Sequence, residues 1–332
     1  MTAVLEGCVA VAHPNIALAK YWGKRARSGN YPAVPSLSVT LDGMMTRTSV
    51  AFDPALVADE ITLGGSPVRA DDRERVLIVL DRVRRAAGIS HHAHVESTND
   101  FPTASGLASS ASGYAALALA ATRAAKLDWT EERVSDLARR GSASAARSIF
   151  GGFVELSAGS ESGSEDEMLA ARAVAPREAL DVRVLVCVVT EEKKAMSSRE
   201  AMAWTAERSP YHAAWLAEAP RIFDTMKVAL AAGDVARVGE LVERSALAMH
   251  ASAMAAGVIF VRGVTLDLFA RVRALREGGA VAYATADAGP HVKVLVATRD
   301  VPSVRAALEA VSGVLRIIEA RPGSGARIVS DV

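Results

Sequence analysis

Short stretches of alternating apolar and polar residues mark the first part of the chain. Residues 7–13 (GCVAVAH), 36–41 (SLSVTL) and 47–52 (RTSVAF) have a period of two, which is typical of strands with one buried face. Residues 60–70 (EITLGGSPVRA) predict a hairpin that turns at its two adjacent glycines. The chain is therefore expected to begin with a sheet.

Helical spacing of apolar residues appears next. The apolar residues between positions 76 and 83 predict a helix, with Asp71 or Asp72 as its N-cap. Residues 92–97 (HAHVES) predict another strand. Thr130 is expected to cap a short helix whose first turn carries two glutamates, where the helix dipole favours negative charge.

The pattern changes after residue 156. Residues 157–167 (SAGSESGSEDE) combine glycine, serine and acid, which predicts an exposed, flexible loop. Residues 181–190 (DVRVLVCVVT) predict a buried strand, and we place a domain boundary before it, giving domains 1–178 and 179–332. Later helices are predicted at 198–206, 210–231, 234–254 and 264–277, then strands at 280–285 and 292–298, a helix and a last strand. Helices and strands mix without a regular βαβ repeat, which favours an α+β fold.

Composition narrows the functional classes. Thirty-eight basic residues balance 38 acidic ones over 332 residues, whereas nucleic-acid binders usually show a basic excess. The two cysteines, Cys8 and Cys187, lie in apolar stretches and exclude a disulfide framework. Neither a signal peptide nor an apolar run of about 18 residues is evident, so we expect a cytoplasmic protein that binds neither membrane nor nucleic acid.

One loop combines several signals of phosphate binding. Residues 101–120 (FPTASGLASSASGYAALALA) place a proline, a glycine and serines directly before an alanine-rich helix. A helix N-terminus offers free amides and about half a positive charge, and phosphate is its common ligand. Gly106 would let the backbone approach phosphates, while Ser109 and Ser110 offer hydroxyls to phosphate or Mg²⁺. The P-loop pattern GxxxxGK[ST] is absent, and a capped structural turn is the alternative.

Three further stretches favour the phosphate interpretation. Residues 15–25 (NIALAKYWGKR) gather basic side chains around an aromatic pair, and residues 141–152 (GSASAARSIFGG) place serines and an arginine on a short helix bounded by glycines. Residues 285–290 (TADAGP) place an aspartate at the end of an apolar strand. With KYWGKR, FPTASGLASSASG, ARSIFGG and DAGP in this order, nearly the whole chain resembles the diphosphomevalonate decarboxylases of the GHMP kinase superfamily.

The resemblance implies a fold, a reaction and partners. It implies a GHMP kinase fold, with an N-terminal domain like ribosomal protein S5 domain 2, a C-terminal ferredoxin-like domain and the active site between them. The implied reaction is ATP- and Mg²⁺-dependent decarboxylation of mevalonate 5-diphosphate to isopentenyl diphosphate, phosphate, ADP and carbon dioxide, in the mevalonate route to isoprenoids. A homodimer is also implied.

The resemblance also assigns residues to roles. The implied catalytic set is Asp287, Lys20 and Arg147, with Arg147 holding the substrate carboxylate. The implied contacts to the diphosphate end are Tyr21, Lys24, Ser142, Ser144 and Arg199. The implied ATP and Mg²⁺ site consists of Ser105, Gly106, Leu107, Ser109, Ser110, Lys193, Ser197 and Ser198.

The chemistry explains why these residue types are needed. A tertiary hydroxyl leaves poorly, so phosphorylation at C3 must precede its departure. A carboxylate can orient that hydroxyl and accept its proton, and cations offset the charge on the transferring phosphoryl group. Arginine suits the substrate carboxylate because its planar fork binds both oxygens.

Each assignment has a structural alternative. Asp287 can be a turn aspartate, the cluster Lys20, Lys24 and Arg25 a solvated basic face, and Arg147 a helix-surface residue. Histidines in residues 91–94 (HHAH) suggest metal binding only weakly, because no acidic or cysteine ligand accompanies them.

Residues 30–38 (NYPAVPSLS) depart from the family pattern NLPxNxSIS at Val34 and Pro35. This departure puts in doubt the contacts of the loop with nucleotide or substrate. The start AHPN also differs from the more frequent APVN. Two other reactions remain open: decarboxylation of the 5-monophosphate, and a mevalonate 3-kinase reaction that stops after phosphoryl transfer. A non-catalytic RNA-binding protein is the third alternative, against which the neutral charge argues.

Overall fold

The computed structural model describes residues 7–101, 109–192 and 196–331, with residues 330 and 331 described by their backbone alone. Four residues of the predicted ATP and Mg²⁺ site lie outside these ranges: Ser105, Gly106, Leu107 and Lys193.

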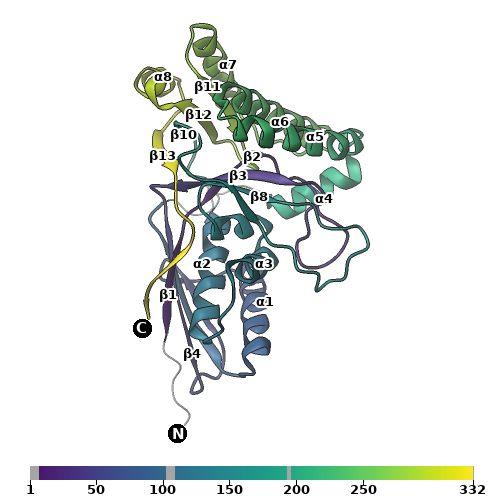
Figure 1. Cartoon of the computed structure of the whole chain (residues 1–332), viewed down its shortest axis with the longest axis vertical. Helices are drawn as coiled ribbons and strands as arrows, with labels where there is room; N and C mark the ends of the chain where they lie inside the picture. The colour runs from purple at the N-terminus through teal and green to yellow at the C-terminus, as the bar shows by residue number, and fades with distance from the viewer. Residues whose placement is uncertain (1–6, 102–108, 193–195, 332) are drawn as a thin grey trace.

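A six-stranded sheet forms one half of the molecule (Figure 1). Its strands, in spatial order, are β14 (Arg327–Asp331), β1 (Cys8–Ala12), β4 (Thr46–Asp53), β7 (His92–Asn99), β5 (Glu60–Leu63) and β6 (Ser66–Pro67). Three helices pack together with this sheet: α1 (Ala70–Ala87), α2 (Ser109–Ala124) and α3 (Glu131–Gly141). Because 7 of the 16 residues of α2 are alanine, its backbone can lie close to β1 and β4, and its buried face fills the core between the layers.

An eight-stranded sheet forms the other half and crosses the predicted domain boundary. Its path is β11 (Ala282–Ala286), β12 (Val292–Ala297), β10 (Val182–Val188), β13 (Arg316–Pro322), β3 (Ser36–Asp42), β8 (Phe153–Leu156) and β9 (Arg172–Ala175), and β2 (Asn15–Ala19) pairs with β3. The remaining elements are η1 (Ala143–Ile149), α4 (Ser198–Arg208), α5 (His212–Ala231), α6 (Val235–Ala255), α7 (Gly263–Glu277), η2 (Thr298–Asp300) and α8 (Val301–Glu309). Strand β13 therefore joins the C-terminal strands to β3 of the N-terminal half.

Strand β10 is buried on both faces. Val184 and Val186 belong to a core with α5 and α6, whereas Leu185 and Cys187 belong to a core with α7 and α8. Successive side chains of a strand point to opposite faces, so one apolar run serves two helical layers. This explains why residues 181–190 are apolar throughout.

The α+β prediction is confirmed, and so is the hairpin of β5 and β6. The predicted cap of α1 is wrong: Arg69 occupies the N-cap position, and Asp71 and Asp72 lie in the first turn, where their charge favours the helix dipole. Thr130 does occupy the N-cap position of α3, without a side-chain capping hydrogen bond.

The acidic loop at residues 157–167 is largely exposed, yet it is anchored. Arg25 donates to the carbonyl oxygen of Gly159 at 3.0 Å, and Arg27 pairs with Glu167 at 2.7 Å. The hydroxyl of Tyr31 donates to the carbonyl oxygen of Glu165 at 3.0 Å. These contacts tie the loop to the segment that follows β2.

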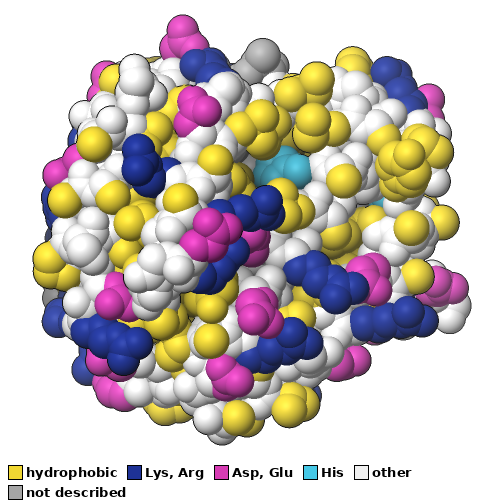
Figure 2. Space-filling model, turned by 90° about the horizontal axis from the view of Figure 1, so that it is seen from above, with side chains coloured by type: hydrophobic (Ala, Val, Ile, Leu, Met, Phe, Trp, Pro, Cys, Tyr) yellow, Lys and Arg dark blue, Asp and Glu magenta, His cyan; other side chains and the backbone are white. Residues whose placement is uncertain are grey.

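Charges of both signs are interspersed on the face shown in Figure 2, without a continuous basic tract. Among the described residues, no helix has the length and apolar character needed to cross a bilayer.

Candidate active site

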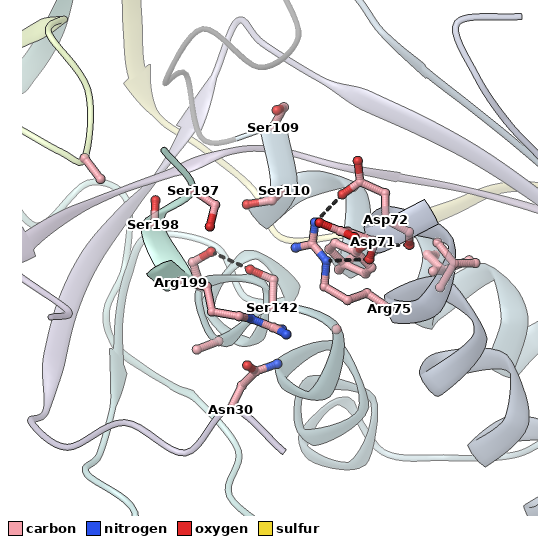
Figure 3. A pocket seen from close by; sticks show the side chains of 18 of the residues that line it. Asn30, Asp71, Asp72, Arg75, Ser109, Ser110, Ser142, Ser197, Ser198 and Arg199 are labelled. Carbon is pink, nitrogen blue, oxygen red and sulfur yellow. Dashed lines mark hydrogen bonds and ion pairs between the residues drawn. The ribbon is translucent and has the colours of Figure 1, made fainter. Parts of the chain in front are cut away.

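A cavity of about 780 Å³ opens between the two sheets and gathers residues from both halves of the chain. The predicted site residues that the structure describes all line it: Lys20, Tyr21, Lys24, Ser109, Ser110, Ser142, Ser144, Arg147, Ser197, Ser198, Arg199 and Asp287. Figure 3 shows one end of this cavity, where Ser110 of α2 lies beside Ser197 at the start of α4, and Arg75 and Asp72 of α1 lie nearby. The sequence therefore predicted which segments meet.

Asp287 lies between two lysines. It directly follows β11, and its Oδ1 is 2.6 Å from Nζ of Lys20, which directly follows β2. Its Oδ2 is 3.0 Å from Nζ of Lys293 on β12. Lys20 also donates to the carbonyl oxygen of Ala17 at 3.0 Å. The aspartate is therefore held by charge at both oxygens.

The electrostatics keep this carboxylate ionised. Burial alone would raise the pKa of Asp287, but the charges and hydrogen bonds of Lys20 and Lys293 outweigh burial and hold that pKa well below its usual range. Burial lowers the pKa of Lys20, and Asp287 opposes that effect. The interpretation of Lys20 as part of a solvated basic face is thus wrong, since the residue is 2% exposed.

Arg147 is buried and bound only to neutral oxygens in the described part of the chain. Its guanidinium, on η1, donates from Nε to Ser38 Oγ at 3.0 Å, from Nη1 to Ser36 Oγ at 2.8 Å and from Nη2 to Asn15 Oδ1 at 3.4 Å. Burial lowers its pKa to about 10. The helix-surface interpretation is wrong, and a buried guanidinium without a carboxylate partner is suited to an anionic ligand.

The neighbouring end of the cavity is rich in polar groups that suit phosphate. Lys24 donates to Asn30 Oδ1 at 2.6 Å, and burial, followed by the charges of Arg199 and Arg75, lowers its pKa to about 8. The hydroxyls of Ser142 and Ser144 lie 3.2 Å apart. Arg199 is exposed at the start of α4.

Tyr21 contributes a buried hydroxyl that has no hydrogen-bond partner among the described residues. Burial raises its pKa above the ordinary value. A buried unpaired hydroxyl costs free energy unless a ligand satisfies it.

The far end of the cavity has both hydroxyls and an apolar wall. Ser109 and Ser110 are the first described residues of α2, and Ser110 is exposed to the cavity. Ile61, Leu63 and Val76 also line the cavity, which gives a flat organic group an apolar surface beside the phosphate-binding hydroxyls.

Ser197 has a structural task. Its hydroxyl accepts a hydrogen bond from the amide of Glu200 at 3.2 Å, and the Glu200 carboxylate accepts from the amide of Ser197 at 2.9 Å, forming a capping box at α4. The predicted ATP contact of this loop therefore suits Ser198 better.

Three residues that contact Asp287 or Arg147 were missed by the sequence analysis. Lys293 lies in an apolar strand, where its neighbours gave no functional signal. Ser36 and Ser38 belong to the loop whose departures raised doubt. Val34 of that loop is fully buried in the cluster that contains Trp22 and does not itself line the cavity. The departure therefore alters packing and leaves both serines on Arg147.

Other candidate sites have structural explanations. Among the described residues, no group of three or more histidine, cysteine or acidic side chains is placed to hold a metal ion. The histidines at 91–94 therefore do not form such a group. Burial raises the pKa of the Cys187 thiol to about 12, so it is not a nucleophile.

Comparisons with known proteins identify the relatives of the chain. The model of the diphosphomevalonate decarboxylase-like N-terminal domain matches residues 12–168, and that of the mevalonate 5-diphosphate decarboxylase C-terminal domain matches residues 184–321. Phosphomevalonate decarboxylase of Haloferax volcanii is 35% identical, with 90% of this chain and 91% of the relative covered. Diphosphomevalonate decarboxylase of Candida albicans is 32% identical, with 84% and 81% covered.

Solved structures agree with these relatives. The crystal structure of mevalonate diphosphate decarboxylase from Staphylococcus aureus has a TM-score of 0.90 and 35% identity, covering 98% of both chains. A structure described as MDDEF in complex with MVAPP, AMPPCP and magnesium has a TM-score of 0.89 and 37% identity, covering 98% of this chain and 99% of that one.

Proposed function

This chain belongs to the diphosphomevalonate decarboxylase family, and on that premise we propose that it converts mevalonate 5-diphosphate, with ATP, to isopentenyl diphosphate, ADP, phosphate and carbon dioxide. Its fold is the GHMP kinase fold of that family, with an S5-like N-terminal domain and a ferredoxin-like C-terminal domain. We keep 1–178 and 179–332 as the proposed limits of these domains.

The observation that carries the proposal is the placement of opposite charges in one cavity. An ionised carboxylate, Asp287, and a buried guanidinium without an acidic partner among the described residues, Arg147, line the same space. A 3-hydroxy acid offers each of them what it lacks: a hydroxyl proton for Asp287 and a carboxylate for Arg147.

The residues support the following sequence of bonds. The C3 hydroxyl oxygen attacks the γ-phosphorus of ATP while its proton moves to a carboxylate oxygen of Asp287, and ADP leaves with the electrons of the broken P–O bond. The C3–O bond then breaks and phosphate departs with its electron pair. The electrons of the bond to the carboxylate form the new C=C bond as carbon dioxide leaves. Because two lysines stabilise its charge, Asp287 takes the proton only as the new O–P bond forms.

Arg147 directs the second half of the reaction. Its three neutral partners fix the guanidinium plane, so a bound carboxylate is held in one orientation relative to C3. Carbon dioxide is neutral, so the attraction to Arg147 weakens as the product forms.

We propose that phosphates of ATP bind at Ser109, Ser110 and Ser198, and that the substrate diphosphate binds at Tyr21, Lys24, Ser142, Ser144 and Arg199. Ser105, Gly106, Leu107 and Lys193, which lie outside the described ranges, belong to the same proposal. Hydroxyl and carboxylate oxygens suit Mg²⁺, and Ser109 and Ser110 offer the hydroxyls. Mg²⁺ would neutralise charge on the phosphates of ATP. A cytoplasmic homodimer that does not bind nucleic acid is part of the proposal.

The 5-monophosphate is the second candidate substrate, because the Haloferax volcanii relative is named for it. The cations Lys24 and Arg199 exceed what a monophosphate requires, which favours the diphosphate. The test measures ADP and carbon dioxide from mevalonate, its 5-phosphate and its 5-diphosphate. We expect the highest kcat/KM for the 5-diphosphate. A comparable value for the 5-monophosphate would favour the alternative, and ADP without carbon dioxide would indicate a kinase.

A further inference from the structure

Two lysines hold Asp287, and only Lys20 was expected from the sequence. Lys293 pairs with Thr285 across β11 and β12. Opposed residues of an antiparallel pair share a face, and Asp287 lies two residues beyond Thr285 on that same side. The hairpin itself therefore brings the ammonium of Lys293 to Oδ2 of Asp287, at 3.0 Å.

Stability does not explain this lysine. Lys293 is 1% exposed, and it pairs with fully buried Val186 on its other side, so an apolar residue would suit the position. Burying an ammonium costs several kcal/mol, and replacing buried ion pairs by apolar residues is often neutral or stabilising. A buried charge that pairs with a carboxylate on the wall of a cavity, as Lys293 does with Asp287, is a candidate for a functional role.

Other groups around Asp287 do not duplicate this contact. Lys20 of the β2 end holds Oδ1. Arg147 of η1 influences Asp287 through its charge, while its guanidinium donates to Ser36, Ser38 and Asn15. His250 of α6 is neutral at pH 7, because burial lowers its pKa to about 4, and its Nε2 lies 3.2 Å from the carbonyl oxygen of Ala286. Oδ2 is thus held by Lys293.

We propose that Lys293 is a positioning residue for the decarboxylation: it fixes the rotation of the Asp287 carboxylate and supplies the second positive charge that holds it ionised. With Oδ2 held by Lys293 and Oδ1 by Lys20, the carboxylate keeps one plane at the wall of the cavity. The expected effect of Lys293 on turnover rests on the proposed function. Its expected effect on the ionisation of Asp287 does not.

The test replaces Lys293 with methionine and with glutamine. Methionine keeps an unbranched chain of similar length without the charge, whereas glutamine keeps an N–H donor and loses the charge. Removing one of two opposite charges should move the acid limb of the kcat/KM pH profile upward by about 1–3 pH units in both variants. Loss of orientation should lower kcat at pH 7 at least about tenfold in Lys293→Met, and less in Lys293→Gln.

Lys227→Met is the matched control. Lys227 pairs with Glu155 at 2.6 Å outside the cavity, so its variant loses a lysine ion pair without touching Asp287. We expect its pH profile to equal that of the wild type. A folded Lys293→Met enzyme with the wild-type profile and kcat within twofold would overturn the proposal.

A carbon-13 NMR titration of the Asp287 carboxyl, assigned by its loss in Asp287→Asn, separates this inference from the proposed function. We expect the Asp287 pKa to rise in both Lys293 variants even if the enzyme decarboxylates neither phosphorylated substrate. An unchanged Asp287 titration refutes the Lys293 contact whatever the activity. If neither variant folds, a crystal structure of the wild type must place Nζ of Lys293 within hydrogen-bond distance of Oδ2 of Asp287, and a separation beyond about 4 Å refutes the contact.

Discussion

Replacing Asp287 with asparagine removes one negative charge from between two ammonium groups and leaves the side-chain volume almost unchanged. The wild-type carboxylate accepts hydrogen bonds at 2.6 Å from Lys20 and at 3.0 Å from Lys293. The amide has a single oxygen, so one lysine keeps an acceptor and the other faces an NH₂ group. The variant also has no oxygen basic enough to take the hydroxyl proton.

The magnitude follows from these contacts. A general base contributes about 10²–10⁴-fold, so turnover should fall at least ~100-fold, which is about 2.7 kcal/mol of barrier. Removing one member of a buried pair typically costs about 3–5 kcal/mol of stability. The carboxylate is 27% exposed and a lysine can release its proton, so we expect a loss near 3 kcal/mol.

The assay is steady-state release of carbon dioxide, with Mg-ATP affinity and the free energy of unfolding measured separately. Mg-ATP affinity should change little, because the hydroxyls proposed to bind its phosphates lie on α2 and α4. Asp267→Asn, the same change at an exposed position on α7, is the control and should retain wild-type turnover. Turnover of Asp287→Asn within a few-fold of wild type would show that the residue is a turn aspartate, and the decarboxylase mechanism would lose its central group.

Two more predictions concern the phosphate ends of the cavity. Ser110→Ala should raise the KM for ATP about fivefold, the equivalent of ~1 kcal/mol for one hydrogen bond, without lowering the melting temperature; normal turnover at limiting ATP would contradict this role. Lys24 has a pKa lowered to about 8, so its ammonium loses its proton as the pH rises, and kcat/KM for the phosphorylated substrate should fall above pH 8. Lys24→Met should have a lower kcat/KM at pH 7 and lack that basic limb, and a limb identical to that of the wild type would exclude Lys24 as its source.

Periodicity predicted the strands and helices that are buried on one face and long enough to show a repeat. Strand β4 alternates buried and partly exposed residues, and α1 repeats its buried valines at helical spacing, so both were found. Strand β2 was missed because four of its five residues are buried, which leaves no alternation in so short a run. The pairing of β13 with β3 joins residues far apart in the sequence, and no local pattern encodes it.

The site was predicted by resemblance and could not be built from local pattern alone. Lys20 and Arg147 look like surface cations in sequence, because their burial depends on strands that lie elsewhere in the chain. Lys293 gave no signal, since its partner is set by hairpin register. Ser36 and Ser38 gave no signal either, because the guanidinium that they contact lies more than 100 residues further along the chain. Residue roles in this cavity therefore depend on tertiary contacts.

The place of β14 beside β1 has a consequence for biosynthesis. Cys8 pairs with Asp331, so the edge of the first sheet is completed by residues made more than 300 positions later (Figure 1). During translation, β1 pairs with β4 on one side, and its other edge stays open to any available strand. Domains commonly fold from the N-terminus as they emerge, but this sheet can close only after residues 327–331 have been made. Chaperone protection of that edge would therefore matter until residues 327–331 have emerged and paired with β1.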